Sequence, residues 1–268
     1  METSARLLND RYELGALLAS GGMGRVWRGR DTVLNRPVAV KILRSEFTGD
    51  ASFVARFRAE AQHAAALHHP NIASVFDYGE VEDDGEQLAY LVMELVDGES
   101  LAALLARQRQ LDVPTSLRIL RGTAAALAVA HSAGLVHRDV KPGNVWLEAA
   151  GGAPPTGVAA PQRVRLLDFG LVQAAAAEAR LTASCTLLGT PAYMAPEQAR
   201  GGAVDHRADL FSLGVVLYEL CTGRLPFAAN TDATKTTPPA PWTLNPEVPE
   251  TLSALVLRLL RPEPSDRG

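Results

Sequence analysis

The sequence is poor in cysteine, in net positive charge and in long apolar runs. Its two cysteines, Cys185 and Cys221, form no CxxC pair, and no secretory signal is recognisable at the N-terminus. We therefore expect reduced thiols in a cytoplasmic protein and no metal bound through cysteine. A formal net charge of −4 argues against a protein that binds nucleic acid backbones, so we expect no nucleic-acid partner.

No apolar run is long enough to cross a membrane. The most apolar stretches, residues 120–136 and 210–221, are interrupted by Arg121, His131 and Glu219. A spanning helix needs about 20 apolar residues, so we expect a soluble chain without a membrane segment. The chain stops in an unfinished helical pattern, which is typical of a fragment, and an anchor downstream of Gly268 in a longer protein stays open.

The composition that is present, 47% hydrophobic and 21% charged residues, is that of an ordinary globular protein. A length of 268 residues allows two core-bearing units or one domain in two lobes. Up to Val96 the pattern favours strands, with apolar runs at residues 38–43 and 89–93. One amphipathic helix interrupts them from Ser52 to Leu67, with Glu60 near its core-facing stripe.

After Gly98 the pattern becomes helical. The clearest predicted helices cover residues 101–109, 114–133, 209–222 and 252–260. We therefore predict an α+β fold with a small β-rich lobe over residues 12–96 and a larger α-helical lobe over residues 97–268. The composition of residues 151–162 predicts a surface loop. The repeated Thr and Pro of residues 228–241 indicate an irregular stretch.

The first candidate site is a glycine-rich turn at residues 19–26, between two predicted strands. Glycines let backbone amides approach phosphate oxygens, although a plain hairpin turn has the same pattern. Lys41 follows within an apolar strand, where an ammonium group is costly to bury unless an anion meets it. An edge lysine facing water is the alternative. With Glu60 on the inward side of the helix, a carboxylate could orient this lysine toward phosphates.

The decisive segment runs from His137 to Asn144 and is followed by Asp168-Phe169-Gly170. Carboxylate and amide oxygens are the hard ligands that magnesium prefers, which suits Asn144 and Asp168. Asp139 is then free to orient a hydroxyl nucleophile. The order of these motifs favours this interpretation over a charged loop without a special role.

These motifs, followed by Ala195-Pro196-Glu197, resemble the signature set of protein kinases. Gly21-Gly22-Met23-Gly24 and residues 189–193 are most similar to eukaryotic-like serine/threonine kinases of bacteria. The resemblance covers Tyr12 to Arg267. It implies a two-lobed kinase fold, with one main helix in the N-lobe and the ATP site in the cleft. It also implies phosphoryl transfer from Mg-ATP, with Mn²⁺ as an alternative metal, to Ser or Thr of protein substrates.

The resemblance assigns a role to individual residues. Catalytic roles fall to Asp139, Lys141, Lys41 and Glu60. Magnesium ligands would be Asn144 and Asp168. Nucleotide contacts would come from Leu18, Ala19, Ser20, Gly21, Gly22, Met23, Gly24, Val26, Ala39, Lys41, Met93, Glu94, Val96 and Trp146. In this scheme Lys41 contacts the α- and β-phosphates, Lys141 neutralises the γ-phosphate, and Glu94 to Val96 form the hinge beside adenine.

Two positions depart from the family pattern and concern the shape of the nucleotide pocket. Ala19 replaces the first glycine of GxGxxG, for which we expect weaker nucleotide binding or little effect. Trp146 stands where the family usually has a smaller aliphatic residue beneath adenine, which would make the pocket shallower or differently shaped.

Further residues resemble architectural and regulatory positions of the family. Asp209 would anchor the catalytic loop, and Glu197 with Arg267 would form a buried ion pair. Arg138 precedes the catalytic aspartate and would need an anion, which a phosphorylated hydroxyl could supply. The candidate phosphorylation sites are Thr182, Ser184 and Thr186, of which we expect autophosphorylation first at Thr182 and Ser184.

Two other functions compete with an active protein kinase. A pseudokinase would keep the fold as a nucleotide-binding signalling module, but Lys41, Glu60, Asp139, Asn144 and Asp168 are all present. A small-molecule phosphotransferase would not explain Ala195-Pro196-Glu197. Dimerisation through the small lobe is known in similar kinases, and no residue in this sequence proves it.

Overall fold

The computed structural model describes residues 6–22, 24–83, 85–148, 163–169, 191–228 and 233–268. Within these residues the chain divides into two compact units, each with its own core. Unit 1 holds the described residues of 6–68 and 73–96, and unit 2 holds 69–72 and the described residues from 97 onward. Outside the described residues lie Met23, the predicted loop at 151–162 and the predicted phosphorylation sites Thr182, Ser184 and Thr186.

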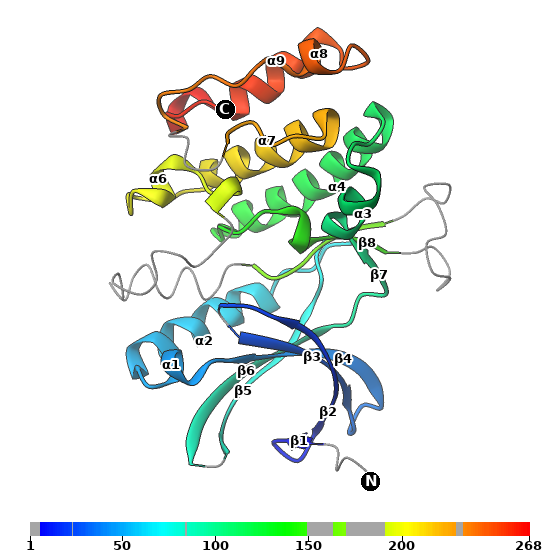
Figure 1. Cartoon of the computed structure of the whole chain (residues 1–268). Helices are drawn as coiled ribbons and strands as arrows, with labels where there is room; N and C mark the ends of the chain where they lie inside the picture. The colour runs from blue at the N-terminus through cyan, green and yellow to red at the C-terminus, as the bar shows by residue number, and fades with distance from the viewer. Residues whose placement is uncertain (1–5, 23, 84, 149–162, 170–190, 229–232) are drawn as a thin grey trace. The chain divides into compact units, whose positions relative to one another are not determined.

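Unit 1 contains a six-stranded antiparallel sheet in the order β1-β2-β3-β4-β6-β5 (Figure 1). Its strands are β1 (Arg6–Leu8), β2 (Tyr12–Ser20), β3 (Gly24–Asp31), β4 (Arg36–Leu43), β5 (Val75–Asp83) and β6 (Glu86–Glu94). Successive side chains of β4 alternate between two faces. Val38, Val40 and Ile42 belong to the core of unit 1, so Ala39 and Lys41 lie on the other face.

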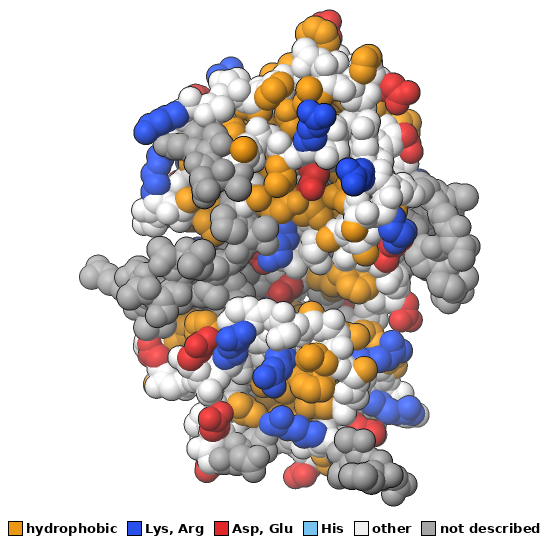
Figure 2. Space-filling view, viewed as in Figure 1, with side chains coloured by type: hydrophobic (Ala, Val, Ile, Leu, Met, Phe, Trp, Pro, Cys, Tyr) orange, Lys and Arg blue, Asp and Glu red, His pale blue; other side chains and the backbone are white. Residues whose placement is uncertain are grey.

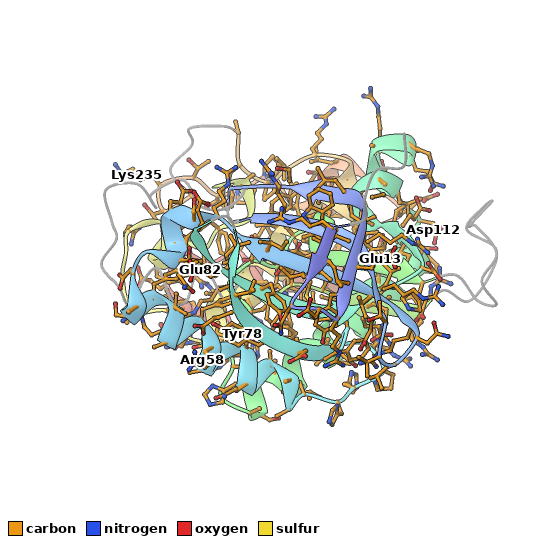
Figure 3. All side chains as sticks on the ribbon, turned by 90° about the horizontal axis from the view of Figure 1, so that it is seen from below. Glu13, Arg58, Tyr78, Glu82, Asp112 and Lys235 are labelled. Carbon is orange, nitrogen blue, oxygen red and sulfur yellow. The ribbon has the colours of Figure 1, made fainter. Side chains whose placement is uncertain are left out.

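Two helices, α1 (Ser45–Thr48) and α2 (Ala51–Ala65), pack against β6 and β5. Helix α2 confirms the helix predicted over residues 52–67, and it begins after Asp50 because that carboxylate caps its first backbone N–H groups. Phe53 and Phe57 are buried, with their ring centroids 6.4 Å apart. On the outer side of α2, Arg58 lies beside Tyr78 of β5 (Figure 3).

Unit 2 is mostly helical, as predicted. Its elements are β7 (Gly98–Ser100), α3 (Leu101–Gln108), α4 (Val113–Ser132), η1 (Pro142–Asn144), β8 (Val145–Glu148), β9 (Arg163–Leu166), η3 (Pro191–Tyr193), α6 (Pro196–Ala199), α7 (Arg207–Thr222), α8 (Pro241–Leu244), α9 (Glu250–Leu259) and η4 (Pro264–Asp266). Strands β7, β8 and β9 form a small antiparallel sheet, and α4 packs against both β9 and α7. Residues 236–240 have no regular secondary structure.

Helix α7 forms the centre of unit 2. Its sequence is apolar on almost every side, so it is buried nearly all round and packs against α9. Helices α7 and α9 each begin two residues before the predicted start, because Arg207 and Glu250 are polar and lie outside the apolar repeat. Among the described residues, no helix combines the length and apolarity needed to cross a bilayer.

Candidate active site

In unit 1, the sheet face opposite the core carries Lys41. The strand register places Val26 and Leu91 on either side of Lys41, and Met93 beside Ala39. The lysine is only 6% exposed, which excludes an edge lysine extended into water. Four residues of the predicted nucleotide site, Val26, Ala39, Lys41 and Met93, therefore share one face of one sheet.

The glycine-rich turn joins β2 to β3. The Gly21 N–H donates to the Gly24 carbonyl at 3.0 Å and closes the turn. A Cβ atom on Gly24 would lie 2.2 Å from the Ile42 carbonyl oxygen, so the approach of β3 to β4 requires glycine there. Apart from Gly21 itself and its two chain neighbours, no described heavy atom lies within 4 Å of a Cβ position built on Gly21. Gly24 thus has a structural role, whereas the space beside Gly21 is open.

Two other predicted parts of the nucleotide site belong to unit 1. Glu60 is partly buried on α2, between Phe57 and Ala61 of the buried stripe, and its pairing with Lys41 stays a prediction. At the end of β6, Glu94 is fixed to Ser74: its N–H donates to the Ser74 carbonyl at 2.9 Å, and its carboxylate accepts from the Ser74 N–H at 3.1 Å. The first residue of the predicted hinge is therefore held firmly.

In unit 2, the loop from His137 to Asn144 folds around Asp139. Oδ2 of Asp139 accepts hydrogen bonds from Nζ of Lys141 at 2.7 Å and from Nδ2 of Asn144 at 3.0 Å. Nδ2 of Asn144 also donates to the Asp139 carbonyl at 2.8 Å. Because the amide nitrogen of Asn144 is used in this way, its amide oxygen is the atom that suits a cation.

One backbone hydrogen bond and one side-chain contact join the residue before Asp168 to the loop of Asn144. The Leu167 N–H donates to the Asn144 carbonyl at 2.8 Å, and Nε2 of His137 contacts the Leu167 carbonyl at 3.0 Å. The buried Phe169 ring lies against His137, with 4.8 Å between the ring centroids. An amide and a carboxylate oxygen from these adjoining segments fit magnesium, which usually takes one or two protein ligands besides water and phosphate.

Asp209 of α7 holds the same loop. Its side chain is fully buried; Oδ1 accepts from the Arg138 N–H at 2.8 Å, and Oδ2 accepts from the His137 N–H at 2.8 Å. Oδ2 also lies 2.7 Å from Nε2 of His131. Arg138 has a φ of 65°, a conformation that costs a non-glycine residue about 1–3 kcal/mol. The buried carboxylate therefore stabilises a strained loop directly before Asp139.

A buried ion pair joins Glu197 of α6 to Arg267. The two guanidinium–carboxylate contacts measure 2.5 and 2.8 Å, and Arg267 has no exposed surface. The guanidinium also donates to the carbonyls of Arg207, Arg261 and Pro262 at 2.7–3.0 Å. Arg267 therefore connects α6, the start of α7 and the segment after α9.

Two polar arrangements were missed by the sequence analysis, because their partners are distant in the chain. Tyr193 donates to Glu219 at 2.6 Å, and burial raises the pKa of both side chains. In unit 1, the buried Asp31 accepts two hydrogen bonds from Arg11, which lower the pKa of this carboxyl to about 2. No local motif marks either pair.

Trp146 and Cys221 occupy different environments in unit 2. Trp146 lies on β8 opposite Ser100 and Arg165, on the face away from the buried Val145 and Leu147, and its place beneath adenine stays a prediction. Cys221 is a free thiol within the core, and burial raises its pKa to about 11.

Comparison with known proteins identifies the class of this domain. A family model described as "Protein kinase domain" matches residues 12–268, so the chain belongs to the protein kinase domain family. Units 1 and 2 are the β-rich N-lobe and the helical C-lobe of this α+β fold. A crystal structure of the Mycobacterium tuberculosis PknI kinase domain matches with a TM-score of 0.73 and 30% identity, covering 96% of this chain and 90% of that one.

Comparison with bacterial relatives shows which type of protein kinase domain this chain is. The chain is 46% identical over 264 residues to the serine/threonine-protein kinase PknA of M. tuberculosis, covering 97% of this chain and 58% of the relative. It is 39% identical over 272 residues to PknB of the same species, covering 99% and 42%. The domain is thus of the eukaryotic-like bacterial serine/threonine type, and the chain spans only about half the length of these relatives.

Proposed function

We propose that this domain transfers the γ-phosphoryl group of ATP to serine or threonine hydroxyls of proteins. The observation that carries the proposal is the arrangement around Asp139. One carboxylate oxygen is held by Lys141 and Asn144, which leaves the other to orient a substrate hydroxyl. The Nζ atom of Lys141 lies 2.7 Å from Oδ2 of Asp139, and its positive charge would balance the negative charge of the transferred phosphoryl group.

The nucleotide is assigned to the sheet face that carries Lys41. Val26, Ala39 and Met93 supply an apolar surface for adenine, and the ammonium group of Lys41 would contact the phosphates. Asn144 and Asp168 would hold Mg²⁺, or Mn²⁺ in its place. When bound, the metal ion would neutralise phosphate charge.

Arg138 supports the proposal that the domain phosphorylates its own activation segment. Nε of Arg138 is buried and has no hydrogen-bond partner among the described residues. A phosphate at Thr182, Ser184 or Thr186 would satisfy this guanidinium group. Incubation with Mg-ATP followed by peptide mapping should locate the modification, and a segment that stays unmodified would contradict this part of the proposal.

Phosphate transfer from labelled ATP to a generic basic protein tests the main function. Wild type should label the substrate, whereas Asp139→Asn and Lys41→Met should reduce transfer at least a hundredfold. Asp205→Asn is the control, since Asp205 lies on the surface of unit 2 and pairs with Arg207. Equal transfer by all four proteins would exclude the proposed site. A nucleotide-dependent thermal shift without transfer would instead support the pseudokinase.

The proposal also includes the location of the domain and its oligomeric state. We expect the domain to act in the cytoplasm. We also expect association of two copies through unit 1, because Val33 and Leu34 in the hairpin between β3 and β4 are 70% and 56% exposed. Sedimentation of wild type and Leu34→Asp checks the second expectation: a monomer at all concentrations would contradict it.

A further inference from the structure

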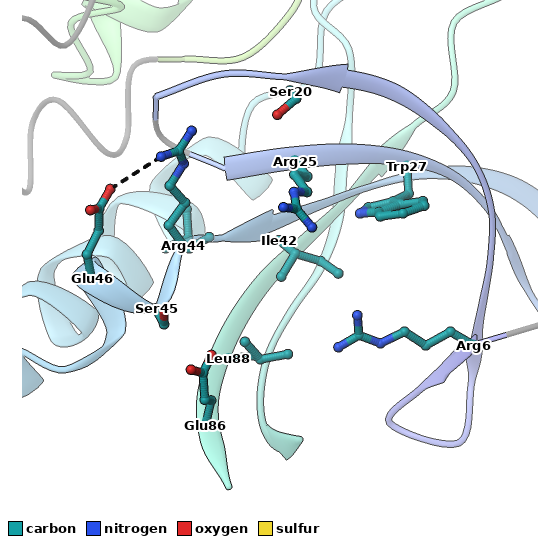
Figure 4. A pocket seen from close by; sticks show the side chains of 11 residues that line it. Arg6, Ser20, Arg25, Trp27, Ile42, Arg44, Ser45, Glu46, Glu86 and Leu88 are labelled. Atoms are coloured by element: carbon teal, nitrogen blue, oxygen red, sulfur yellow. Dashed lines mark ion pairs between the residues drawn. The ribbon is translucent and has the colours of Figure 1, made fainter. Parts of the chain in front are cut away.

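A basic pocket lies on the core side of the unit 1 sheet, near α1 (Figure 4). It has a volume of about 490 Å³. Its lining comes entirely from unit 1: Arg6, Ser20, Arg25, Trp27, Ile42, Leu43, Arg44, Ser45, Glu46, Glu86 and Leu88. None of these residues except Ser20 belongs to the predicted nucleotide site.

The strand register explains why the basic pocket is separate from the face that carries Lys41. Arg25 lies opposite Ser20 on one side and Ile42 on the other, so these three residues share one face of the sheet. The neighbouring pair, Val26 and Lys41, is one residue further along each strand and lies on the opposite face. A ligand in the basic pocket would therefore not compete directly with a nucleotide beside Lys41.

The chemistry of the basic pocket suits an anion attached to an apolar group. Arg6, Arg25 and Arg44 bring three guanidinium groups from different parts of unit 1, and Trp27 and Leu88 add apolar surface. Figure 2 shows basic side chains around an apolar area on unit 1. The two carboxylates of the lining, Glu46 and Glu86, offset only part of this charge.

The ion pair between Arg44 and Glu46 is weak, so an anion that binds Arg44 more strongly could replace Glu46. Nη1 of Arg44 is 3.9 Å from Glu46, a long contact between side chains that are 50% and 61% exposed. Such an exposed pair contributes little to stability. A phosphate group carries a charge of about −1.5 to −2 and three acceptor oxygens, and it binds guanidinium groups more strongly than one carboxylate does.

We propose that the basic pocket binds a phosphorylated serine or threonine of a protein segment, with an adjacent apolar side chain against Trp27. The choice of phosphate over a plain carboxylate rests on the proposed function, because that reaction produces phosphoserine and phosphothreonine. The three arginines would share the phosphate oxygens, and the hydroxyl of Ser20 or Ser45 would add a neutral donor.

A ligand bound in the basic pocket would also affect the glycine-rich turn. Nη2 of Arg44 donates to the Gly21 carbonyl at 2.9 Å, so the same guanidinium group lines the pocket and holds the turn. A phosphate that draws Arg44 away removes this hydrogen bond. We expect the bound phosphopeptide to raise the KM for ATP in wild type and to leave it unchanged in Arg44→Gln.

The binding test uses a fluorescein-labelled peptide, Ala-Leu-phosphothreonine-Leu-Ala, and fluorescence anisotropy without nucleotide. Wild type should bind it saturably below about 1 mM, the weak end of specific recognition. Arg25→Gln and the double variant Arg25→Gln/Arg44→Gln should weaken binding at least tenfold. Arg30→Gln is the matched control: it removes the same charge from β3, but Arg30 bonds to Asn35 outside the basic pocket.

Each outcome decides the proposal. No saturation by 1 mM, equal binding of the unphosphorylated or a glutamate-containing peptide, or an equal loss in Arg30→Gln would overturn it. Inorganic phosphate that binds alone while the peptide does not would also overturn it. Thermal melting of each variant verifies folding. A wild-type protein that transfers phosphate but does not bind the peptide refutes only the basic pocket, whereas a wild-type protein that binds the peptide but transfers no phosphate refutes the proposed kinase activity.

Discussion

Replacement of the buried Asp209 by asparagine tests how much the catalytic loop depends on one carboxylate. Its two oxygens accept two backbone N–H groups and contact His131. An asparagine has one acceptor oxygen, so its amide nitrogen must face either the Arg138 N–H or the His137 N–H. At least one hydrogen bond to a charged acceptor is lost, and two donors are left face to face in a buried position.

The expected cost follows from these contacts. A hydrogen bond to a charged group contributes about 1.5–3 kcal/mol, and a buried donor without an acceptor adds to the loss. We expect Asp209→Asn to lower the free energy of unfolding by about 2–4 kcal/mol, or the melting temperature by about 5–15 °C. Urea unfolding followed by tryptophan fluorescence suits this measurement, because Trp146 and Trp242 lie in unit 2.

A measurement of kcat separates an effect on the catalytic loop from a loss of overall stability. Displacement of Asp139 should lower kcat, since an error of about 1 Å at a reacting group can cost a hundredfold. The matched control is Asp205→Asn, which alters a 45% exposed side chain two residues before α7 and should change stability by about 0–1 kcal/mol. Equal effects of the two substitutions, or an unchanged kcat in folded Asp209→Asn, would refute this account of the loop.

Two further changes test buried charges elsewhere. Arg267→Met leaves the Glu197 carboxylate without its counter-ion, so the free energy of unfolding in urea should fall by about 3–5 kcal/mol, and a loss below about 1 kcal/mol would contradict the assignment. Asp31→Asn should show a pH-dependent effect. Since Arg11 lowers the pKa of Asp31 from 3.8 to about 2, the stability from this carboxylate is present above pH 4 and is lost as the pH falls through about 2. The difference from wild type should shrink over that range, and a constant difference would argue against it.

Much of the fold was predictable because the apolar periodicity is strong in the longer elements. The helix predicted at 114–133 is Val113–Ser132, and the strand at 38–43 lies within Arg36–Leu43. Helix ends follow local side chains such as Asp112, which caps α4. The short strands β7 and β9 were not predicted, since three or four residues carry too little periodicity.

From the residues alone, the candidate site was predictable only where they are close in sequence, whereas the distant contacts of Asp209 with the catalytic loop and of Glu197 with Arg267 were expected only from the resemblance to protein kinases. Asp139, Lys141 and Asn144 share one loop, so their hydrogen-bonded arrangement follows from a local motif. The basic pocket has no such motif, because Arg6, Arg25 and Arg44 come together only through the strand register. Register depends on how whole strands pair, and one sequence read by itself does not reveal it.

The position of Arg267 has a consequence for the way the protein is made. Chains emerge from the ribosome from the N-terminus, and a domain folds once its parts are available. Unit 1 has all its described strands by residue 96, whereas Glu197 receives its counter-ion only when residue 267 has been synthesised. The ion pair between Glu197 and Arg267 can therefore form only after residue 267 has been synthesised, and fragments that stop before Arg267 should be less stable because the Glu197 carboxylate would be buried without its counter-ion.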